Sequence, residues 1–458
     1  MHRNRKSKPP IMNDDKMINL HGVKFPRNYL TQHLGIFGNS GSGKTNGCLK
    51  PLLRSLLRQG DAAVIFDVKG DLLDITKDAL NRCGRIQDLV TLGVGENDCT
   101  FNPLANPVLS AHEIATQLVT SLSFTGQGSQ QRSRNDEMFW EQWRIELLTV
   151  MVELARAVTV ADKVPLTFTH LQKLRPFFSQ EHSKLERWAR EAGLLLSETS
   201  AATLMEFSAL AETTRGCVVG SALTLLSPFL RPPISDFVIP TGKRPALNLP
   251  DILNQSKVLV VTGAQAEHAQ NLWPAFLWFK QALYQMVLSR TRLPVRQDNQ
   301  LLVVIDEYNR LMMGADSPMS EHVVMEAARS NKTNFILAAQ NLSGLEIAGG
   351  GSVVVDKLTA LTSNLCFLSN SCTVTARLAE TVLGKRKTFD KHRTISHQPP
   401  PPLFFPQNHH PRTTYSNTVL VPVEKPVLSA EQMARLKPGH GYIKLVDGSV
   451  HKIKCTFD

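Results

Sequence analysis

The chain has 458 residues, of which 42% are hydrophobic and 20% are charged, a globular balance that excludes a chain too polar to build a core. Lys and Arg outnumber Asp and Glu by 51 to 40, and the net charge of +11 favours a polyanionic partner, either nucleic acid or an acidic membrane surface. A merely basic soluble protein fits the charge equally well. The length suggests about three domains, or one large domain that carries an insert.

Cysteine usage and hydropathy indicate the cellular compartment in which the protein works. The seven cysteines are scattered, form no Cys-x-x-Cys pair and have no zinc-ligand spacing, which indicates reduced thiols in a cytosolic protein. The basic N-terminus precedes no apolar stretch, so it is not a secretory signal. The most apolar long window, residues 271–288, contains Asn271, Lys280 and Gln281 and is too polar to span a membrane. We therefore expect a chain that is soluble by itself.

Strand and helix patterns alternate near the N-terminus. Residues 1–18 are predicted to be a disordered basic tail. After it, apolar runs predict strands at 34–37, 62–68 and 88–94, and the segments 45–59 and 70–84 between them are predicted to be helical. This alternation implies βαβ units and a parallel sheet.

The pattern changes after "FNPLANP", residues 101–107, and apolar residues recur at helical spacing from about 111 to 230. We predict an inserted all-α domain there, because strand signals are nearly absent. One stripe of apolar side chains is interpreted as helix core and not as a base-stacking platform. Its members are Trp140, Trp143, Leu147, Met151, Leu154 and Val158.

Sheet signals resume in the last 200 residues. Strands are predicted at 257–264, 300–308, 334–340 and 364–370, with helices at about 268–289 and 318–330. Residues 387–425, rich in Pro and His, are interpreted as a flexible surface loop, with a polyproline-type partner ligand as the alternative. A β-hairpin is predicted around Asp447-Gly448.

The segment "GNSGSGKT" matches the complete pattern G-x-x-x-x-G-K-[ST] and lies between a predicted strand and a predicted helix. Its glycines let backbone N–H groups converge on phosphates, and the helix N-terminus adds partial positive charge. Lys44 is suited to neutralise the β- and γ-phosphates, and the hydroxyl of Thr45 is suited to bind Mg²⁺. The predicted nucleotide-binding residues are Gly38, Asn39, Ser40, Gly41, Ser42, Gly43, Lys44 and Thr45.

Nucleotide hydrolysis also needs a carboxylate for the metal ion and a base for the water. The stretch "LLVVIDEY" supplies both at the end of a buried strand. Asp306 is predicted to belong to the Mg²⁺ site, and Glu307 is predicted to orient and deprotonate the water. Glu307 favours an ATP motor over a GTPase switch or a small-molecule kinase.

Three further features supply polar candidates for this site. Gln340 ends a predicted strand and is expected at the same sheet edge, where its amide could sense the γ-phosphate. Arg329 lies just before that strand, and an ordinary solvated arginine is the alternative interpretation. Asp67 and Lys69 leave the second strand beside the phosphate loop, with Gly70 forming a tight turn.

Taken together, these motifs resemble the TraG/TraD-type coupling proteins of type IV secretion and conjugation, in the FtsK/HerA branch of P-loop motors. The resemblance runs from about residue 20 to 458 and depends on the order and spacing of "GNSGSGKT", "FDVKGDL", "FNPL", "LLVVIDEYNRL", "ARSNKTNFILAAQ" and "TVTARLAETVLGK". It implies a RecA-like α/β motor domain with a mainly parallel sheet at 19–110 and 245–458, and an inserted all-α domain at 111–244.

The resemblance also implies an activity and partners. We expect a ring, commonly of six subunits, that hydrolyses ATP with Mg²⁺ and drives DNA, or a protein substrate, into a secretion channel. Arg329 matches the family's arginine that reaches across a subunit boundary. Channel ATPases and a relaxase or another secreted substrate are the expected partners. Residues 384–393, with five Lys or Arg and one Asp, are a candidate DNA-binding patch, or else a solvated face.

This chain departs from the family in having no N-terminal transmembrane helix. Either a separate membrane protein docks it, or it is a soluble version or a fragment, and we expect it in the cytoplasm or at the inner face of the membrane. Two other functions stay open. One is a HerA-like repair or packaging translocase, and the other is a receptor for secreted proteins with ATP turnover as a gate. The sequence does not distinguish single-stranded from duplex DNA.

Overall fold

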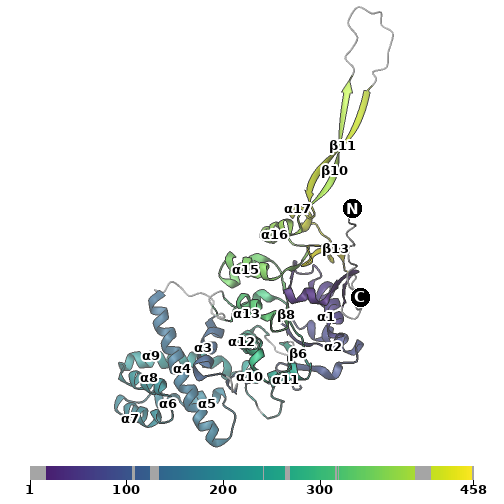
Figure 1. The fold of residues 1–458 in the computed structure, drawn as a ribbon. Helices are drawn as coiled ribbons and strands as arrows, with labels where there is room; N and C mark the ends of the chain where they lie inside the picture. The colour runs from purple at the N-terminus through teal and green to yellow at the C-terminus, as the bar shows by residue number, and fades with distance from the viewer. Residues whose placement is uncertain are drawn as a thin grey trace, which may run out of the picture.

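The computed structural model describes residues 17–105, 109–123, 134–240, 242–263, 269–314, 317, 319–397 and 414–455. Its centre is a nine-stranded sheet in the order β13-β12-β9-β3-β8-β7-β4-β6-β5 (Figure 1). The strands from β9 to β5 in this order are parallel, whereas β12 and β13 add an antiparallel edge. The strands are β3 (Leu34–Phe37), β4 (Ala62–Asp67), β5 (Leu89–Leu92), β6 (Val258–Thr262), β7 (Leu301–Ile305), β8 (Thr333–Ala339), β9 (Asn364–Leu368), β12 (His440–Lys444) and β13 (Val450–Lys454).

The central strands are buried along their whole length because helices cover both faces of the sheet. Alternate residues of β4 belong to two separate cores: Val64 and Phe66 point to one face, and Ala63 and Ile65 point to the other. One face is covered by α1 (Lys50–Leu57), α2 (Leu72–Arg82) and the small hairpin of β1 (Met17–Leu20) and β2 (Val23–Pro26). The other face is covered mainly by α12 (Trp273–Ser289), α13 (Glu321–Ala328), α14 (Leu342–Gly349), α15 (Ser352–Leu361) and α16 (Thr373–Leu383).

This architecture confirms the predicted α/β, RecA-like sheet. It also confirms the C-terminal hairpin, because β12 and β13 pair through a turn at Asp447-Gly448. The predicted tail, residues 1–18, falls outside the described residues except for Met17 and Ile18, which begin β1 and are therefore not disordered. All seven cysteines are free, as the sequence predicts. Among the described residues, no helix combines the length and apolar character that crossing a bilayer requires.

Helices joined by short connections make up the segment between Ala111 and Val238, and its described residues include no strand of the sheets. The longest helix, α4, carries the predicted aromatic stripe, of which Leu147, Met151 and Leu154 are buried but Val158 is 48% exposed. Trp140 and Trp143 are partly buried and pack against the same core. The core interpretation is therefore confirmed except at Val158. The helices of this segment are α3 (Ala111–Ser123), α4 (Arg134–Asp162), α5 (Phe168–Lys173), α6 (Arg175–Phe178), α7 (His182–Gly193), α8 (Glu198–Ala209), α9 (Glu212–Leu226) and α10 (Ile234–Val238).

The helical segment packs on the sheet region through α12. The ring of Trp278 lies edge-on to Phe168 and Phe229, with ring centres 5.4 and 5.1 Å apart, and these two phenylalanines stack on each other at 4.7 Å. Such pairs add about 0.5–1.5 kcal/mol each beyond the burial of apolar area. The helices therefore share one continuous core with the sheet face that α12 covers.

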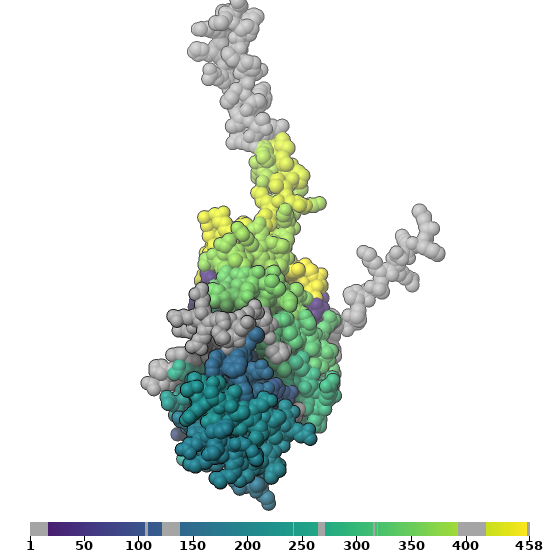
Figure 2. All heavy atoms as spheres, turned by 90° about the vertical axis from the view of Figure 1, so that its left-hand side faces the viewer, coloured from purple at the N-terminus to yellow at the C-terminus, as the bar shows by residue number. Residues whose placement is uncertain are grey.

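A long two-stranded arm replaces most of the loop predicted at 387–425, so that prediction is wrong for the residues that the structure describes. β10 (Lys385–His397) and β11 (Thr414–Pro426) pair antiparallel along their whole length. The polyproline stretch lies outside the described residues. The loop interpretation gave weight to proline and histidine and overlooked β-branched residues on both flanks, such as Thr388 and Ile395 before them and Val419, Val421 and Val423 after them. The arm leaves the body at the end opposite the helical segment (Figures 1 and 2).

Candidate functional site

The phosphate loop follows β3 and leads into a π-helical turn, Lys44–Leu49, which continues as α1. Two of its glycines are required by geometry. A Cβ at Gly38 would stand 2.4 Å from Oγ of Ser42 and 2.9 Å from Cβ of Leu368, so a side chain there would collide with the loop. Gly43 has φ +102°, in the left-handed region that favours glycine. The loop is thus folded as the phosphate-cradle pattern predicts.

The polar groups of this loop are arranged around an anion site. Nζ of Lys44 donates to the carbonyl oxygens of Gly38 (2.7 Å) and Asn39 (3.1 Å). Burial lowers the pKa of Lys44, and the nearby carboxylates of Glu307 and Asp306 oppose that shift. Oγ of Ser42 is buried and has no hydrogen-bond partner within the described part of the chain. An unsatisfied buried hydroxyl and a lysine whose hydrogen bonds within the described residues go to backbone carbonyls suit a phosphate ligand.

Thr45 and Asp306 meet beside the loop. Oγ1 of Thr45 donates to Oδ2 of Asp306 over 3.2 Å. Burial raises the pKa of Asp306, whereas the backbone N–H of Glu307, which donates to its Oδ1 over 2.9 Å, lowers it. A hydroxyl and a carboxylate side by side are the hard oxygen ligands that Mg²⁺ takes together with phosphate oxygens. These two residues could therefore hold Mg²⁺.

Glu307 lies at the centre of the site and is completely buried. Its backbone adopts a left-handed conformation, with φ +50°, which is uncommon for a residue with a Cβ and turns the chain sharply after β7. Nε2 of Gln340 donates to Oε2 of Glu307 over 3.0 Å, and Nζ of Lys69 forms an ion pair with Oε1. Burial alone would raise the pKa of Glu307, but the hydrogen bond and charge of Lys69, with Gln340 and Lys44, lower it below its usual value.

The strand order explains why Gln340 reaches Glu307. β8 lies between β3, which precedes the phosphate loop, and β7, which precedes Asp306. These strands are parallel, so their carboxyl ends share one edge of the sheet. Gln340 directly follows β8, and the edge therefore brings together the phosphate loop, the two carboxylates and this amide, as the sequence predicts.

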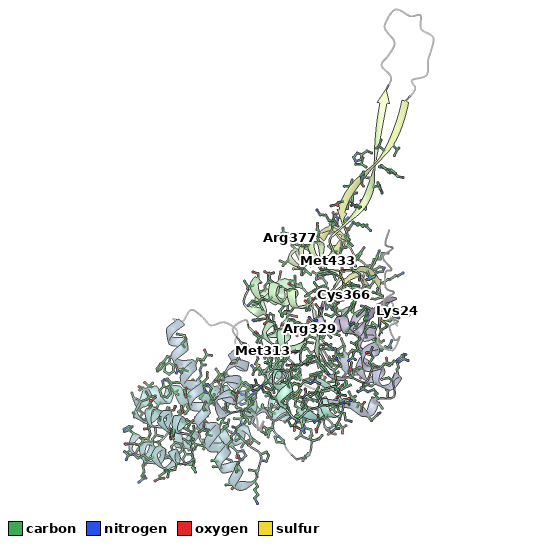
Figure 3. All side chains as sticks on the ribbon, viewed as in Figure 1. Lys24, Met313, Arg329, Cys366, Arg377 and Met433 are labelled. Carbon is green, nitrogen blue, oxygen red and sulfur yellow. The ribbon has the colours of Figure 1, made fainter. Side chains whose placement is uncertain are left out.

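Arg329 lies elsewhere. It follows α13 and precedes β8, which places it at the amino end of the strand that carries Gln340 at the other end (Figure 3). It is exposed, and its charge acts on His33, the residue just before β3. β8 has seven residues, a rise of about 23 Å. Within one chain Arg329 is thus remote from the phosphate loop.

The sequence did not identify the groups that support the phosphate loop from β9. The backbone N–H of Asn39 donates to the carbonyl of Ser369 (2.8 Å), and its side-chain amide donates to Oγ of Ser371 (3.2 Å). Asn370 donates through its side-chain amide to the carbonyl of Gln340 (2.6 Å). These residues directly follow β9, and the polar run Ser-Asn-Ser after an apolar strand was the only available signal. Lys69 was placed beside the loop, but its contact with Glu307 was not foreseen.

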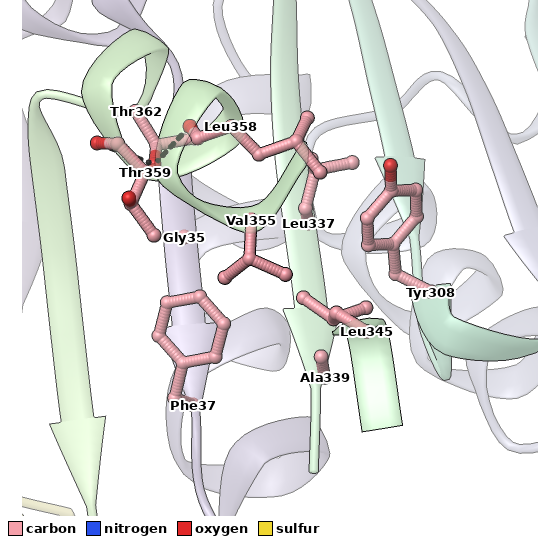
Figure 4. A pocket seen from close by; sticks show the side chains of 10 residues that line it. All are labelled: Gly35, Phe37, Tyr308, Leu337, Ala339, Leu345, Val355, Leu358, Thr359 and Thr362. Carbon is pink, nitrogen blue, oxygen red and sulfur yellow. Dashed lines mark hydrogen bonds between the residues drawn. The ribbon is translucent and has the colours of Figure 1, made fainter. Parts of the chain in front are cut away.

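A small apolar pocket lies near the site, between β3, β8 and α15 (Figure 4). Phe37, Leu345 and Val355 are among the residues that line it, and the ring of Tyr308, the residue after Glu307, lies at one side. Apolar walls do not suit phosphates, so this pocket is separate from the anion site. We interpret it as a gap in the packing of α15 against β3, the strand before the phosphate loop.

Comparisons with known proteins agree with this geometry. A family model described as "Type IV secretory system Conjugative DNA transfer" matches residues 3–415. No curated protein sequence matches. Among solved structures, the unbound conjugative coupling protein TrwBdeltaN70 is similar over 98% of this chain and 90% of its own, with TM-score 0.65 and 16% identity. TrwB with ADP and Mg²⁺ covers the same shares, with TM-score 0.60 and 17% identity.

A third structure, TrwB in complex with a non-hydrolysable ATP analogue, has TM-score 0.62 and 17% identity over 98% of this chain and 91% of its own. At 16–17% identity, these solved structures support the fold alone. The family model supports the family, because it matches most of the chain. The resemblance to coupling proteins seen in the sequence motifs is confirmed. The chain belongs to the family of type IV secretory system conjugative DNA-transfer proteins.

Proposed function

We propose that the chain is an ATP-hydrolysing, Mg²⁺-dependent motor that drives a DNA or nucleoprotein substrate toward a type IV secretion channel. The observation that carries the proposal is the meeting of Thr45, Asp306, Glu307 and Gln340 at the mouth of a complete phosphate loop. Two of the solved TrwB structures hold ADP with Mg²⁺ or an ATP analogue on the same fold, which supports ATP as the ligand here.

Each residue has a chemical task in this proposal. Lys44 turns from the carbonyls of Gly38 and Asn39 to the β- and γ-phosphates and neutralises their charge. Thr45 and Asp306 supply oxygen ligands for Mg²⁺, which neutralises phosphate charge when bound. Glu307 orients the attacking water and accepts its proton. Gln340, which already holds Oε2 of Glu307, lies where it can sense the terminal phosphate and relay that contact to the base.

DNA is the proposed track, and the arm is the proposed additional contact. The candidate basic segment, residues 384–393, forms the first part of β10. Because side chains alternate across a strand, Lys387, Phe389 and Lys391 lie on one face of the arm. Both lysines are exposed, and Phe389 is 67% exposed. Cations that alternate with an aromatic ring suit a nucleic-acid strand, through phosphate contacts and base stacking.

The assembly is part of the same proposal. We propose a motor domain at 19–110 and 245–458, an all-α domain at 111–244, and a hexameric ring of identical subunits. The chain would work at the inner face of the membrane through a separate anchor protein, with channel ATPases and a relaxase or other secreted substrate as partners. The helical segment shares one hydrophobic core with the sheet face that α12 covers. A conformational change of the motor domain would therefore be transmitted to the helices.

The test is the ATPase rate of the full chain with no DNA, with single-stranded DNA and with duplex DNA, at several salt concentrations. We expect Lys44-dependent hydrolysis that rises with one of the two DNAs and DNA binding that weakens steeply with salt, because cations bound to phosphate are released. Lys44→Ala should abolish nucleotide binding, since it removes the charge that faces the phosphates.

Three other results would lead to other conclusions. Hydrolysis with no response to DNA would favour a receptor for secreted proteins in which ATP turnover is a gate. DNA stimulation without capture of secretion-channel ATPases would favour a repair or packaging translocase. Unchanged ATP affinity in Lys44→Ala would refute the nucleotide site itself.

A further inference from the structure

Lys69 lies at the same sheet edge as the two carboxylates. β4 and β7 are parallel neighbours, with Phe66 opposite Ile305, so the loop after β4 leaves the sheet beside Glu307. This loop has a defined shape. Asp67 accepts hydrogen bonds from the backbone N–H of Gly70 at Oδ1 (2.7 Å) and of Leu73 at Oδ2 (2.9 Å). Asp67 therefore fixes the turn that aims Lys69 at Glu307.

The ion pair with Lys69 engages the carboxylate of Glu307, the proposed general base. Nζ of Lys69 pairs with Oε1 of Glu307, while Gln340 holds Oε2. A general base needs to accept a hydrogen bond from the water that it deprotonates, and its basicity depends on its negative charge. The carboxylate of Glu307 is held through both oxygens here, and a cation neutralises it. In this arrangement Glu307 is restrained.

The two partners differ in their freedom to move. The side chain of Glu307 is 0% exposed, whereas that of Lys69 is 34% exposed. If the pair opens, Lys69 is the member that can swing away. Its charge also acts on Lys44, which places it close to the phosphate cradle. A bound triphosphate carries several negative charges next to that cradle and can compete with Glu307 for the lysine ammonium.

We propose that Lys69 is a positioning residue that restrains Glu307 while no triphosphate is bound, and that its ammonium group moves to the terminal phosphate when one binds. The exchange frees Oε1 of Glu307 to meet the attacking water. Lys69 takes no part in bond making or breaking, and it makes the base available only when there is a terminal phosphate to transfer. This inference depends on the nucleotide site proposed above.

The experiment measures binding, not turnover. Isothermal titration calorimetry of the full chain with Mg²⁺ gives the Kd of ADP and of a non-hydrolysable ATP analogue in a Glu307→Gln background, where the ion pair is already removed. Three double variants are compared with that background: Lys69→Met, Lys69→Arg and Lys77→Met. Lys77 is a matched control on α2, because it is 46% exposed and its ion pair with Asp74 is long, at 3.4 Å.

The proposal predicts a specific pattern. Glu307→Gln alone should tighten the analogue relative to wild type, because Lys69 no longer has to leave a carboxylate. Adding Lys69→Met should weaken the analogue by at least about tenfold and leave ADP within about twofold, which corresponds to one charge-assisted hydrogen bond. Lys69→Arg should retain most of the affinity for the analogue, and Lys77→Met should change neither ligand.

The contrary results are distinguishable. Equal weakening of ADP and analogue by Lys69→Met would show that Lys69 is a structural brace and would overturn the proposal. No change for either ligand would show that Lys69 contacts only Glu307 and would overturn it as well. If wild type binds neither ligand, or if Lys44→Ala binds both as tightly as wild type, the nucleotide site itself is wrong and the role of Lys69 falls with it.

Discussion

The side-chain amide of Gln340 donates to Oε2 of Glu307 across 3.0 Å, and this bond joins the ends of two parallel strands on which the chemistry of the site depends. Because Gln340 follows β8 and β8 also borders the phosphate-loop strand, a change at the loop has a direct route to the base. Glu307 is completely buried, so its orientation is set by its partners and not by solvent.

Glu307→Gln should therefore keep nucleotide binding and lose turnover. The amide retains the shape and an oxygen that can accept from Gln340, but it cannot take a proton from water. We expect kcat to fall by about 10²–10⁴-fold while the affinity for an ATP analogue is retained and, as proposed above for Lys69, increased. Glu326→Gln, an exposed glutamate on α13, is the control and should behave as wild type. Near-normal turnover in Glu307→Gln would mean that another group is the base.

A second prediction concerns an ion pair beneath the turn that follows β7. Lys280 of α12 and Glu321 of α13 pair at 0% and 1% exposure. Oε1 of Glu321 also accepts from the hydroxyl of Tyr284 (3.2 Å), and Oε2 accepts from the backbone N–H of Met313 (3.2 Å). Burial lowers the pKa of Lys280, and Glu321 opposes that shift. The network fixes the chain that leaves the Asp306–Glu307 turn.

Glu321→Ala should destabilise the fold by about 3–5 kcal/mol, because it leaves the Lys280 ammonium buried without a counter-charge. Urea unfolding followed by circular dichroism measures the change. Glu431→Ala, which breaks the ion pair with Arg435 at 72% and 78% exposure, is the matched control and should cost less than about 1 kcal/mol. The double variant Lys280→Met/Glu321→Leu should regain part of the loss. Equal effects of the buried and exposed variants would contradict this account.

A third prediction is a pH dependence from His33. Its Nδ1 accepts from the backbone N–H of Phe335 and its Nε2 donates to the carbonyl of Met325, both at 3.1 Å, so the ring is neutral. Burial lowers its pKa to about 4, and the charge of Arg329 adds to the lowering, while the bond to Met325 opposes it. The unfolded chain has the ordinary value of about 6.5 and binds a proton first as the pH falls.

The contribution of His33 to stability is therefore complete above about pH 6.5 and is lost as the pH falls toward 4, by about 3 kcal/mol in total. Unfolding free energies between pH 8 and 4 for wild type and His33→Gln should show a steeper decline for wild type over this window. His112→Gln, at an exposed position on α3, should keep the wild-type slope. Parallel curves for wild type and His33→Gln would refute the assignment.

The sequence predicts those parts of the site whose local structure is determined by one short motif. The pattern from Gly38 to Thr45 dictates a loop between strand and helix, and the run before Asp306 can only be a buried strand, so both reach the same edge. It could not predict the partner of Lys69, because that contact depends on β4 and β7 being neighbours although 238 residues separate Lys69 from Glu307. The arm was missed for a different reason. β10 and β11 follow each other in the chain and pair as a hairpin, but proline and histidine in the connecting stretch suggested a loop and outweighed the β-branched residues beside it.

The last prediction is that Arg329 acts on a neighbouring subunit. In its own chain it lies at the amino end of β8, about 23 Å from the edge that carries Gln340, so it cannot reach that site. It is exposed, and a guanidinium is always charged and can grip phosphate oxygens in a fork. Supplied across a subunit boundary, such a group can raise the hydrolysis rate by about 10³-fold or more. ATPase activity should then rise more than linearly with protein concentration, because each site needs a neighbour.

Mixing two inactive variants tests this. Arg329→Ala keeps its base and Glu307→Gln keeps its arginine, so a mixed ring contains interfaces at which an intact Glu307 faces an intact Arg329. Activity should partly return on mixing, and it should depend on the ratio of the two variants. Arg377→Ala, which removes an exposed arginine on α16, is the control and should be active by itself. If the mixture stays inactive although it assembles, Arg329 does not act across a subunit boundary and the prediction is wrong. If Arg329→Ala alone is fully active, Arg329 is an ordinary surface arginine.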